Sequence, residues 1–181
     1  MKRLLLVVCL IAVMLAGAQA FADLNGADVT VHYIYPTFGT IYQTLGSGTV
    51  TGGGFTANSF GQHDYTTYPT DITLTNVSGG DVFFLTASFN GYQLVVNSGG
   101  SPITGVTIAV NNVAGFNASL ISFDATDVWV NMQGLTTNPG LDWQLDLQFG
   151  TTIPEPSSLA LMGAGLLGIL GVVRRRIVGN R

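Results

Sequence analysis

The chain has 181 residues, of which six are Lys or Arg and ten are Asp or Glu, and its formal net charge is -4 at pH 7. That length allows one ordinary domain with short appendages. All the basic residues lie near the two ends, so the stretch from Asp23 to Thr152 has aspartates as its only charged side chains. A domain without cations argues against nucleic-acid or nucleotide binding, lysine Schiff-base chemistry and arginine clamps on anionic substrates.

Residues 1–22 have the order of a secretory signal peptide. Met1-Lys2-Arg3 is a positive segment, residues 4–15 form an uncharged apolar run, and small residues follow. This order predicts export through the general secretion machinery and cleavage by signal peptidase after Ala20 or Ala22. The one cysteine of the chain lies within the apolar run, so the mature protein is expected to have no disulfide and no thiolate.

A cluster of oxygen side chains lies near the predicted mature N-terminus. Asp23, Asn25 and Asp28 fall within six residues, and the pairs Asp124/Asp127 and Asp142/Asp146 offer further carboxylates. Hard cations prefer such ligands, so calcium is the cofactor that the sequence most suggests. The cluster does not match the twelve-residue calcium loop with its terminal Glu. We favour an Asx-type turn at the start of a strand, and we predict no cofactor.

The region 23–152 is predicted to be an all-β domain, an antiparallel β-sandwich of jelly-roll type. Residues from Val29 to Phe149 alternate with period two and are β-branched or aromatic, with Gly, Asn and Asp between the runs. In the last run, the apolar residues from Trp143 to Phe149 alternate with polar ones, as in a strand with one buried face. Strands are predicted over 29–35, 70–77, 81–89, 94–96, 103–110, 118–123, 127–132 and 143–149, with edge strands and loops in 37–68.

Asn90-Gly91 stands between two of these runs. Both residue types tolerate a positive φ, which a two-residue type I′ hairpin requires at both central positions. The sequence therefore predicts a tight hairpin turn at Asn90-Gly91.

The two histidines raise the alternative of a small secreted hydrolase. A Ser-His-Asp or Asp-centred site is conceivable at His63 and Asp64, but no G-x-S-x-G elbow is present. His32 lies in the middle of a predicted strand, where a structural role is expected. Most aspartates fall at turns or strand ends, where Asp is common for backbone reasons. We predict a non-enzymatic domain and keep the hydrolase as the alternative.

Tyrosines offer another kind of site. Aromatic rings can form a stacking platform for sugars without using any charge. Core and cross-strand packing explain tyrosines in strands equally well. The six candidates are Tyr33, Tyr35, Tyr42, Tyr65, Tyr68 and Tyr92.

The C-terminal segment 153–181 contains a predicted transmembrane helix over residues 157–173. Such a helix is roughly 26 Å long at about 1.5 Å per residue, slightly short of a hydrocarbon core of about 30 Å. Arg174, Arg175 and Arg176 in the tail 174–181 are expected to stop it at the cytoplasmic face, which leaves the β domain outside. Gly163, Gly165 and Gly168 match G-x-G-x-x-G, but prolines rather than a strand precede them, so the match does not indicate a nucleotide site.

Pro154-Glu155-Pro156, the short glycine-rich apolar segment and the three arginines together resemble the PEP-CTERM sorting signal. The resemblance covers residues 153–181. It implies an exported protein of a Gram-negative bacterium that also makes extracellular polysaccharide. It also implies that an exosortase recognises Pro154, Glu155 and Pro156 as its processing site. A physical alternative is that the two prolines form a stiff spacer between the domain and the membrane.

These features lead to one functional expectation. The protein is exported and held in the inner membrane with its domain in the periplasm, and it is then released to the cell surface or the extracellular matrix. Its role there is expected to be structural or adhesive, or to involve weak binding of neutral polysaccharide, because the domain has hydroxyl, amide and tyrosyl groups but no cations.

Overall fold

The computed structural model describes residues 22–150, which form antiparallel β-structure and one short 3₁₀ helix. In residues 22–150 the elements are β1 (Asp28–Ile34), β2 (Ile41–Thr49), β3 (Phe55–Ser59), β4 (His63–Thr67), β5 (Asp71–Asn76), β6 (Val82–Phe83), β7 (Gly91–Ser98), β8 (Ile103–Asn111), η1 (Ala118–Leu120), β9 (Ile121–Phe123), β10 (Asp127–Asn131), β11 (Thr136–Thr137) and β12 (Gly140–Phe149). The expected all-β, antiparallel class is confirmed.

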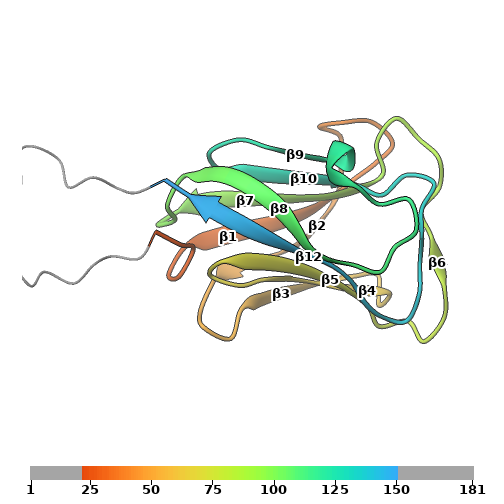
Figure 1. Ribbon diagram of the computed structural model, residues 1–181, viewed down its shortest axis with the longest axis horizontal. Helices are drawn as coiled ribbons and strands as arrows, with labels where there is room; N and C mark the ends of the chain where they lie inside the picture. Colours follow the sequence, from red (N-terminus) through yellow and green to blue (C-terminus); the bar gives the residue numbers. More distant parts are fainter. Residues whose placement is uncertain (1–21, 151–181) are drawn as a thin grey trace, which may run out of the picture. The chain divides into compact units, whose positions relative to one another are not determined.

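Two five-stranded sheets face each other (Figure 1). One has the strand order β2-β1-β7-β10-β9, and the other has the order β3-β4-β5-β12-β8. The strands β6 and β11 form a separate two-stranded ribbon at one end. The arrangement is sandwich-like, while the jelly-roll type stays a prediction. Within residues 22–150, no helix is long and apolar enough to cross a membrane, and the predicted span 157–173 lies outside the described residues.

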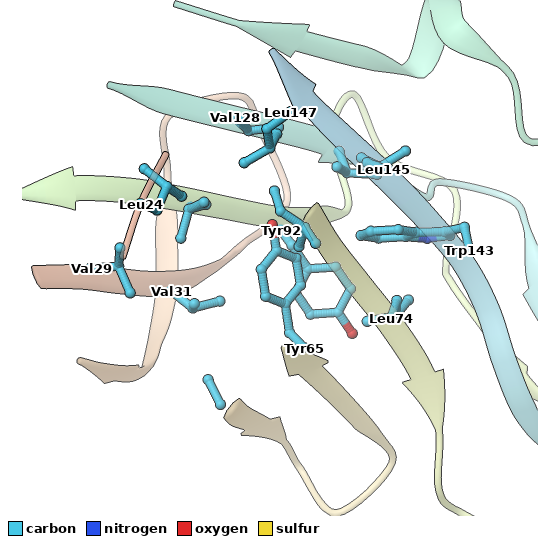
Figure 2. Close-up of a cluster of buried hydrophobic side chains, with 14 of the residues drawn as sticks. Leu24, Val29, Val31, Tyr65, Leu74, Tyr92, Val128, Trp143, Leu145 and Leu147 are labelled. Carbon is cyan, nitrogen blue, oxygen red and sulfur yellow. The ribbon is translucent and has the colours of Figure 1, made fainter. Parts of the chain in front are cut away.

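The core lies between the two sheets and takes side chains from both (Figure 2). Tyr92 on β7 packs against Tyr65 on β4 with ring centroids 5.4 Å apart, which joins the two sheets at the centre. On β12 the residues Trp143, Leu145 and Leu147 are buried and Asp146 is exposed, so the alternation expected of this strand is confirmed. Burial of these large side chains is the main favourable term in folding.

Both ends of the described chain lie at the same end of the sandwich. The N–H of Ser101 donates to the carbonyl of Asp23 at 3.0 Å, and the N–H of Gly150 donates to the carbonyl of Pro102 at 2.9 Å. β1 begins near this end and runs to the opposite one, where the β6–β11 ribbon lies (Figure 1). Below, the two are called the Gly150 end and the ribbon end.

The prediction of a hairpin turn at Asn90-Gly91 is wrong. Neither residue has a positive φ, and Gly91 opens β7, where it pairs with Asn131 of β10 and Ile34 of β1. Glycine is needed here for space, because a Cβ at this position would lie 1.9 Å from the carbonyl oxygen of Val130. The sequence signal for a turn at this position reports a close strand contact instead.

Other predicted strands are correct only in part. Of the run 81–89, only Val82–Phe83 is a strand, because the chain turns away after the hydrogen bond from the N–H of Phe84 to the carbonyl of Leu135. Of the run 118–123, the first half is η1, which Asn117 caps by accepting from the N–H of Ser119. The stretch 37–68 holds the edge strands β2 and β3 together with β4, so the expectation of edge strands there is confirmed.

Candidate functional site

A groove with aromatic walls opens at the ribbon end of the sandwich. Its cavity volume is about 280 Å³, close to the lower limit of the roughly 300–1,000 Å³ usual for ligand pockets. Several of its apolar side chains are half-exposed or more: Tyr42 at 63%, Leu85 at 58%, Phe83 at 55% and Phe60 at 51%. The lining residues are Tyr33, Tyr35, Tyr42, Phe60, Phe83, Leu85 and Asn90. We call this site the aromatic groove.

Three tyrosines line the aromatic groove: Tyr33 on β1, Tyr35 just after β1, and Tyr42 on β2. The pairing of β1 with β2 shifts register between Val31 and His32 and again between Tyr33 and Ile34, and such bulges re-aim side chains. The ring of Tyr33 meets that of Tyr92 in the core at 5.5 Å and that of Tyr42 at 6.2 Å. Tyr35 meets Tyr42 edge-to-face at 6.1 Å. A continuous series of rings therefore connects the core to the surface.

Phe60 comes from the turn between β3 and β4. Its ring contacts Tyr33 at 5.5 Å and Tyr42 at 6.3 Å, both edge-to-face. Phe60 is the only non-glycine residue in 22–150 with a positive φ, at 55°, and Gly61 follows at 70°. With the hydrogen bond from the N–H of Gln62 to the carbonyl of Ser59, residues 59–62 form a β-turn whose central pair has the positive φ values of a type I′ turn, within a three-residue loop between the paired Ser59 and His63.

Asn90 joins residues of the aromatic groove through hydrogen bonds. It is 2% exposed; its side-chain oxygen accepts a hydrogen bond from the hydroxyl of Tyr33, and its amide donates to the carbonyl of Leu85 at 2.8 Å. Its own N–H donates to the side chain of Asn131. These bonds fix the position of Tyr33 relative to the segment that contains Phe83 and Leu85.

The aromatic groove has no charged side chain among its lining residues. Burial raises the pKa of the Tyr33 hydroxyl, so this group stays protonated at neutral pH and keeps its hydrogen bond to Asn90. Aromatic faces with a few hydroxyl and amide groups suit a ligand that is apolar on one side and polar on the other. A neutral sugar ring fits this description.

The structure separates the six tyrosines predicted as a platform. Tyr33, Tyr35 and Tyr42 meet at the aromatic groove. Tyr65 and Tyr92 are fully buried in the core, so for these two the core-packing alternative holds and the platform alternative does not. Tyr68 is half-buried near Gly54 and outside the groove lining. Sequence reasoning missed Phe60, Phe83, Leu85 and Asn90, and the available signal was an aromatic residue within the polar turn sequence Ser59-Phe60-Gly61.

His63 and Asp64 do not form the pair that the hydrolase alternative requires. They are consecutive on β4, so their side chains point to opposite faces, and Asp64 accepts from the amide of Asn58 at 2.7 Å. The buried neighbours of His63 are the hydroxyl of Thr137 at 2.8 Å and the carboxylate of Asp142 at 3.8 Å. Burial lowers the pKa of His63 to about 4 and raises that of Asp142 to about 7.

His32 has the structural role that its strand position predicted. Its Nδ1 lies 3.0 Å from the hydroxyl of Thr44 on the neighbouring strand. Burial lowers its pKa, and the carboxylate of Asp127 opposes that effect.

The two carboxylates near the predicted mature N-terminus, Asp23 and Asp28, accept hydrogen bonds from other residues. Asp23 accepts from the N–H of Asn25 at 2.9 Å, which is the favoured Asx-type turn. Asp28 accepts from the hydroxyls of Thr49 and Ser98. Within residues 22–150, no group of three or more His, Cys, Asp or Glu side chains is placed to hold a metal ion.

Asp124 and Asp127, the second carboxylate pair considered, belong to a hydrogen-bonded turn. Asp124 accepts from the N–H groups of Thr126 and Asp127, both at 2.8 Å, and these bonds lower its pKa. Asp127 accepts from the hydroxyl of Thr126 and the amide of Gln93, each at 2.7 Å. Both carboxylates therefore serve the backbone and strand contacts around this turn.

Comparison with known proteins finds one match. The family described as PEP-CTERM protein-sorting motif matches residues 152–176, which include Pro154, Glu155, Pro156 and the three arginines. The chain carries a PEP-CTERM protein-sorting motif. The PEP-CTERM motif indicates an exported protein that is anchored in a membrane and processed by an exosortase. No curated protein and no solved structure is significantly similar to the chain. The matched residues lie outside the described ones, so the motif and the aromatic groove are treated separately.

Proposed function

We propose that the protein is a non-enzymatic cell-surface or extracellular-matrix protein of a Gram-negative bacterium, and that its β domain binds neutral polysaccharide in the aromatic groove. The single observation that supports this most is the gathering of exposed rings from β2, the β3–β4 turn and β6, beside the half-buried Tyr33 and Tyr35, around a cavity at the ribbon end. Exposed apolar surface of this kind marks interaction sites in soluble domains.

The charge distribution supports a neutral ligand. Residues 23–152 contain no Lys and no Arg, so an acidic polysaccharide would find no cation and would be repelled by the aspartates. Stacking on Tyr42 and Phe60, with hydrogen bonds to tyrosyl hydroxyls, needs no charge. We therefore expect neutral hexose polymers to bind and uronic-acid polymers not to bind.

The route to the surface is part of the same proposal. Signal peptidase cleaves after Ala20 or Ala22, the helix 157–173 holds the chain in the inner membrane with Arg174–Arg176 at the cytoplasmic face, and an exosortase processes the chain at Pro154, Glu155 and Pro156. Intact-mass spectrometry of the protein from the host's membrane and extracellular fractions tests this route. The proposal expects an extracellular species that ends near Pro156. A species that retains Arg181 and occurs only in the membrane would contradict processing.

Binding is tested with the full chain in mild detergent, by biolayer interferometry on immobilised dextran, laminarin, galactomannan and the host's own exopolysaccharide. Alginate serves as the acidic comparison. Tyr42→Ala should weaken binding by at least about tenfold, equivalent to about 1.4 kcal/mol. Phe123→Ala is the matched control, since Phe123 is an exposed aromatic residue on β9 away from the groove. The proposal fails if no neutral polysaccharide binds, or if the two variants bind equally well.

A further inference from the structure

The turn between β3 and β4 contains a residue type that is unfavourable for the backbone conformation of the turn. A type I′ turn needs a positive φ at both central residues, and Asn, Asp or Gly normally occupy the first of them. Here that residue is Phe60, whose φ of 55° brings its Cβ close to the neighbouring carbonyl oxygen. Residues held in such conformations away from glycine concentrate at functional sites.

The surrounding hydrogen bonds hold Phe60 in this conformation. The N–H of Gly61 donates to the side chain of Asn58 at 2.7 Å, and the N–H of Gln62 donates to the carbonyl of Ser59 at 2.9 Å. The amide of Asn58 also donates to Asp64 across the hairpin. The turn is therefore fixed by its neighbours, and Phe60 adapts to it.

Burial in the core does not explain why position 60 is a phenylalanine. Half of the Phe60 side chain is exposed, and its contacts are with Tyr33 and Tyr42 at the rim of the aromatic groove. A polar residue that favours a positive φ would suit both the turn and the solvent better. Neither local conformation nor core packing accounts for a phenylalanine here.

We propose that Phe60 is a specificity-determining residue of the aromatic groove, presented by a strained turn so that its exposed ring stacks on a bound sugar. This inference rests on the proposed function. Phe60 and Tyr42 offer ring faces from two different sheets, β3–β4 and β1–β2. A ligand that contacts both must present flat apolar faces to two rings, which selects unbranched neutral hexose chains over branched ones.

The test uses Phe60→Asn, Phe60→Ala and Phe60→Trp in the full chain, with binding to the unbranched glucan pullulan and to branched dextran and with thermal unfolding as readouts. Phe60→Asn removes the ring but suits the turn, so binding should fall by about tenfold. Its unfolding midpoint should lie about 2–4 °C above that of Phe60→Ala, which loses the ring and keeps the strain. Phe60→Trp keeps an aromatic face and should bind within about twofold of the wild type.

The outcomes separate the two proposals. If the wild type binds and Tyr42→Ala weakens binding while Phe60→Asn does not, the role of Phe60 is overturned and the aromatic groove stands. Equal midpoints for Phe60→Asn and Phe60→Ala would overturn the strained turn. A wild type that binds no neutral polysaccharide would overturn both.

Discussion

The two ends of the sandwich are built differently. At the Gly150 end, Leu24, Ala27 and Val50 are fully buried, and the backbone is joined by hydrogen bonds such as those from the N–H of Leu24 to Pro69 and from the N–H of Val50 to Ala27. At the ribbon end, aromatic side chains stay half-exposed around a cavity. Folding alone explains the first arrangement. The second keeps apolar surface in water, which the proposed binding role would explain.

The largest loss of stability is expected at a buried position whose role is packing alone. Leu24→Ala removes a fully buried side chain, and Leu→Ala changes in cores destabilise by about 2–5 kcal/mol. Urea unfolding measures this loss. The folded fraction should still bind polysaccharide as the wild type does, because Leu24 lies at the Gly150 end. A loss below about 1 kcal/mol would mean that this end is not tightly packed.

Asn90→Ala acts at the ribbon end through the scaffold of the aromatic groove. It removes the hydrogen bonds to the carbonyl of Leu85 and the hydroxyl of Tyr33, and each such part-buried bond contributes about 0.5–1.5 kcal/mol. Unfolding by urea and polysaccharide binding should both weaken. Asn97→Ala removes an exposed hydrogen bond to Thr30 and should change stability by no more than about 0.5 kcal/mol. Equal effects of the two variants would contradict the scaffold role of Asn90.

The buried pair His63 and Asp142 gives a pH dependence that is hidden in the wild type. The pKa of His63 falls on folding from 6.5 to about 4, so its protonation makes stability rise with pH between these values. The pKa of Asp142 rises from 3.8 to about 7, so its ionisation makes stability fall over nearly the same range. The two slopes oppose each other, and together they should cancel between about pH 4 and 6.5.

Single substitutions at the pair should reveal each slope. Asp142→Asn should leave a stability that rises with pH, and His63→Gln one that falls, each by at most about 1.4 kcal/mol per pH unit relative to the wild type. Urea unfolding at pH 4, 5, 6 and 7 measures both. Parallel profiles for the wild type and both variants would show that the pair does not titrate on folding. Asp64 stays in place in Asp142→Asn, so its electrostatic effect on His63 is common to that variant and the wild type.

The smallest expected effect is on binding, and it separates the ring of Tyr42 from its hydroxyl as the group that holds the ligand. Tyr42→Phe keeps the ring and removes only the hydroxyl, so binding to neutral polysaccharide should stay within about threefold of the wild type if stacking dominates. Biolayer interferometry with Tyr42→Ala beside it makes the comparison. Equal losses for the two variants would show that the hydroxyl, and not the ring face, holds the ligand.

Local patterns in the sequence predicted the strands well where one face of the strand is exposed to solvent. The alternation from Trp143 to Phe149 is visible because Asp146 and Gln148 face solvent. The prediction of a turn at Asn90-Gly91 failed, because Tyr33 and Asn131, two partners of Asn90, and the carbonyl beside Gly91 belong to strands distant in sequence. The positive φ pair occurs at Phe60 and Gly61, where the residue types argue against it.

The candidate site was only partly predictable for a related reason. Alternation says which residues share a face, but it does not say that β1, β2 and the β3–β4 turn meet at one end of the sandwich. Tyrosine is suited to both core and groove, so residue type could not separate Tyr33 from Tyr65. Asp142, 79 positions after His63, replaced the adjacent Asp64 as its buried acidic neighbour. By contrast, the sorting motif is contiguous, and the sequence alone was enough to predict it.

The most direct test of the account is NMR mapping of the full chain in detergent micelles during titration with a neutral glucan hexasaccharide. The account predicts chemical-shift changes of the Tyr33, Tyr42 and Phe60 rings and of the segment around Leu85. It predicts none at Leu24 or Val50. Changes centred on the Gly150 end or on the outer strand faces, or no saturable change at the aromatic groove, would contradict it.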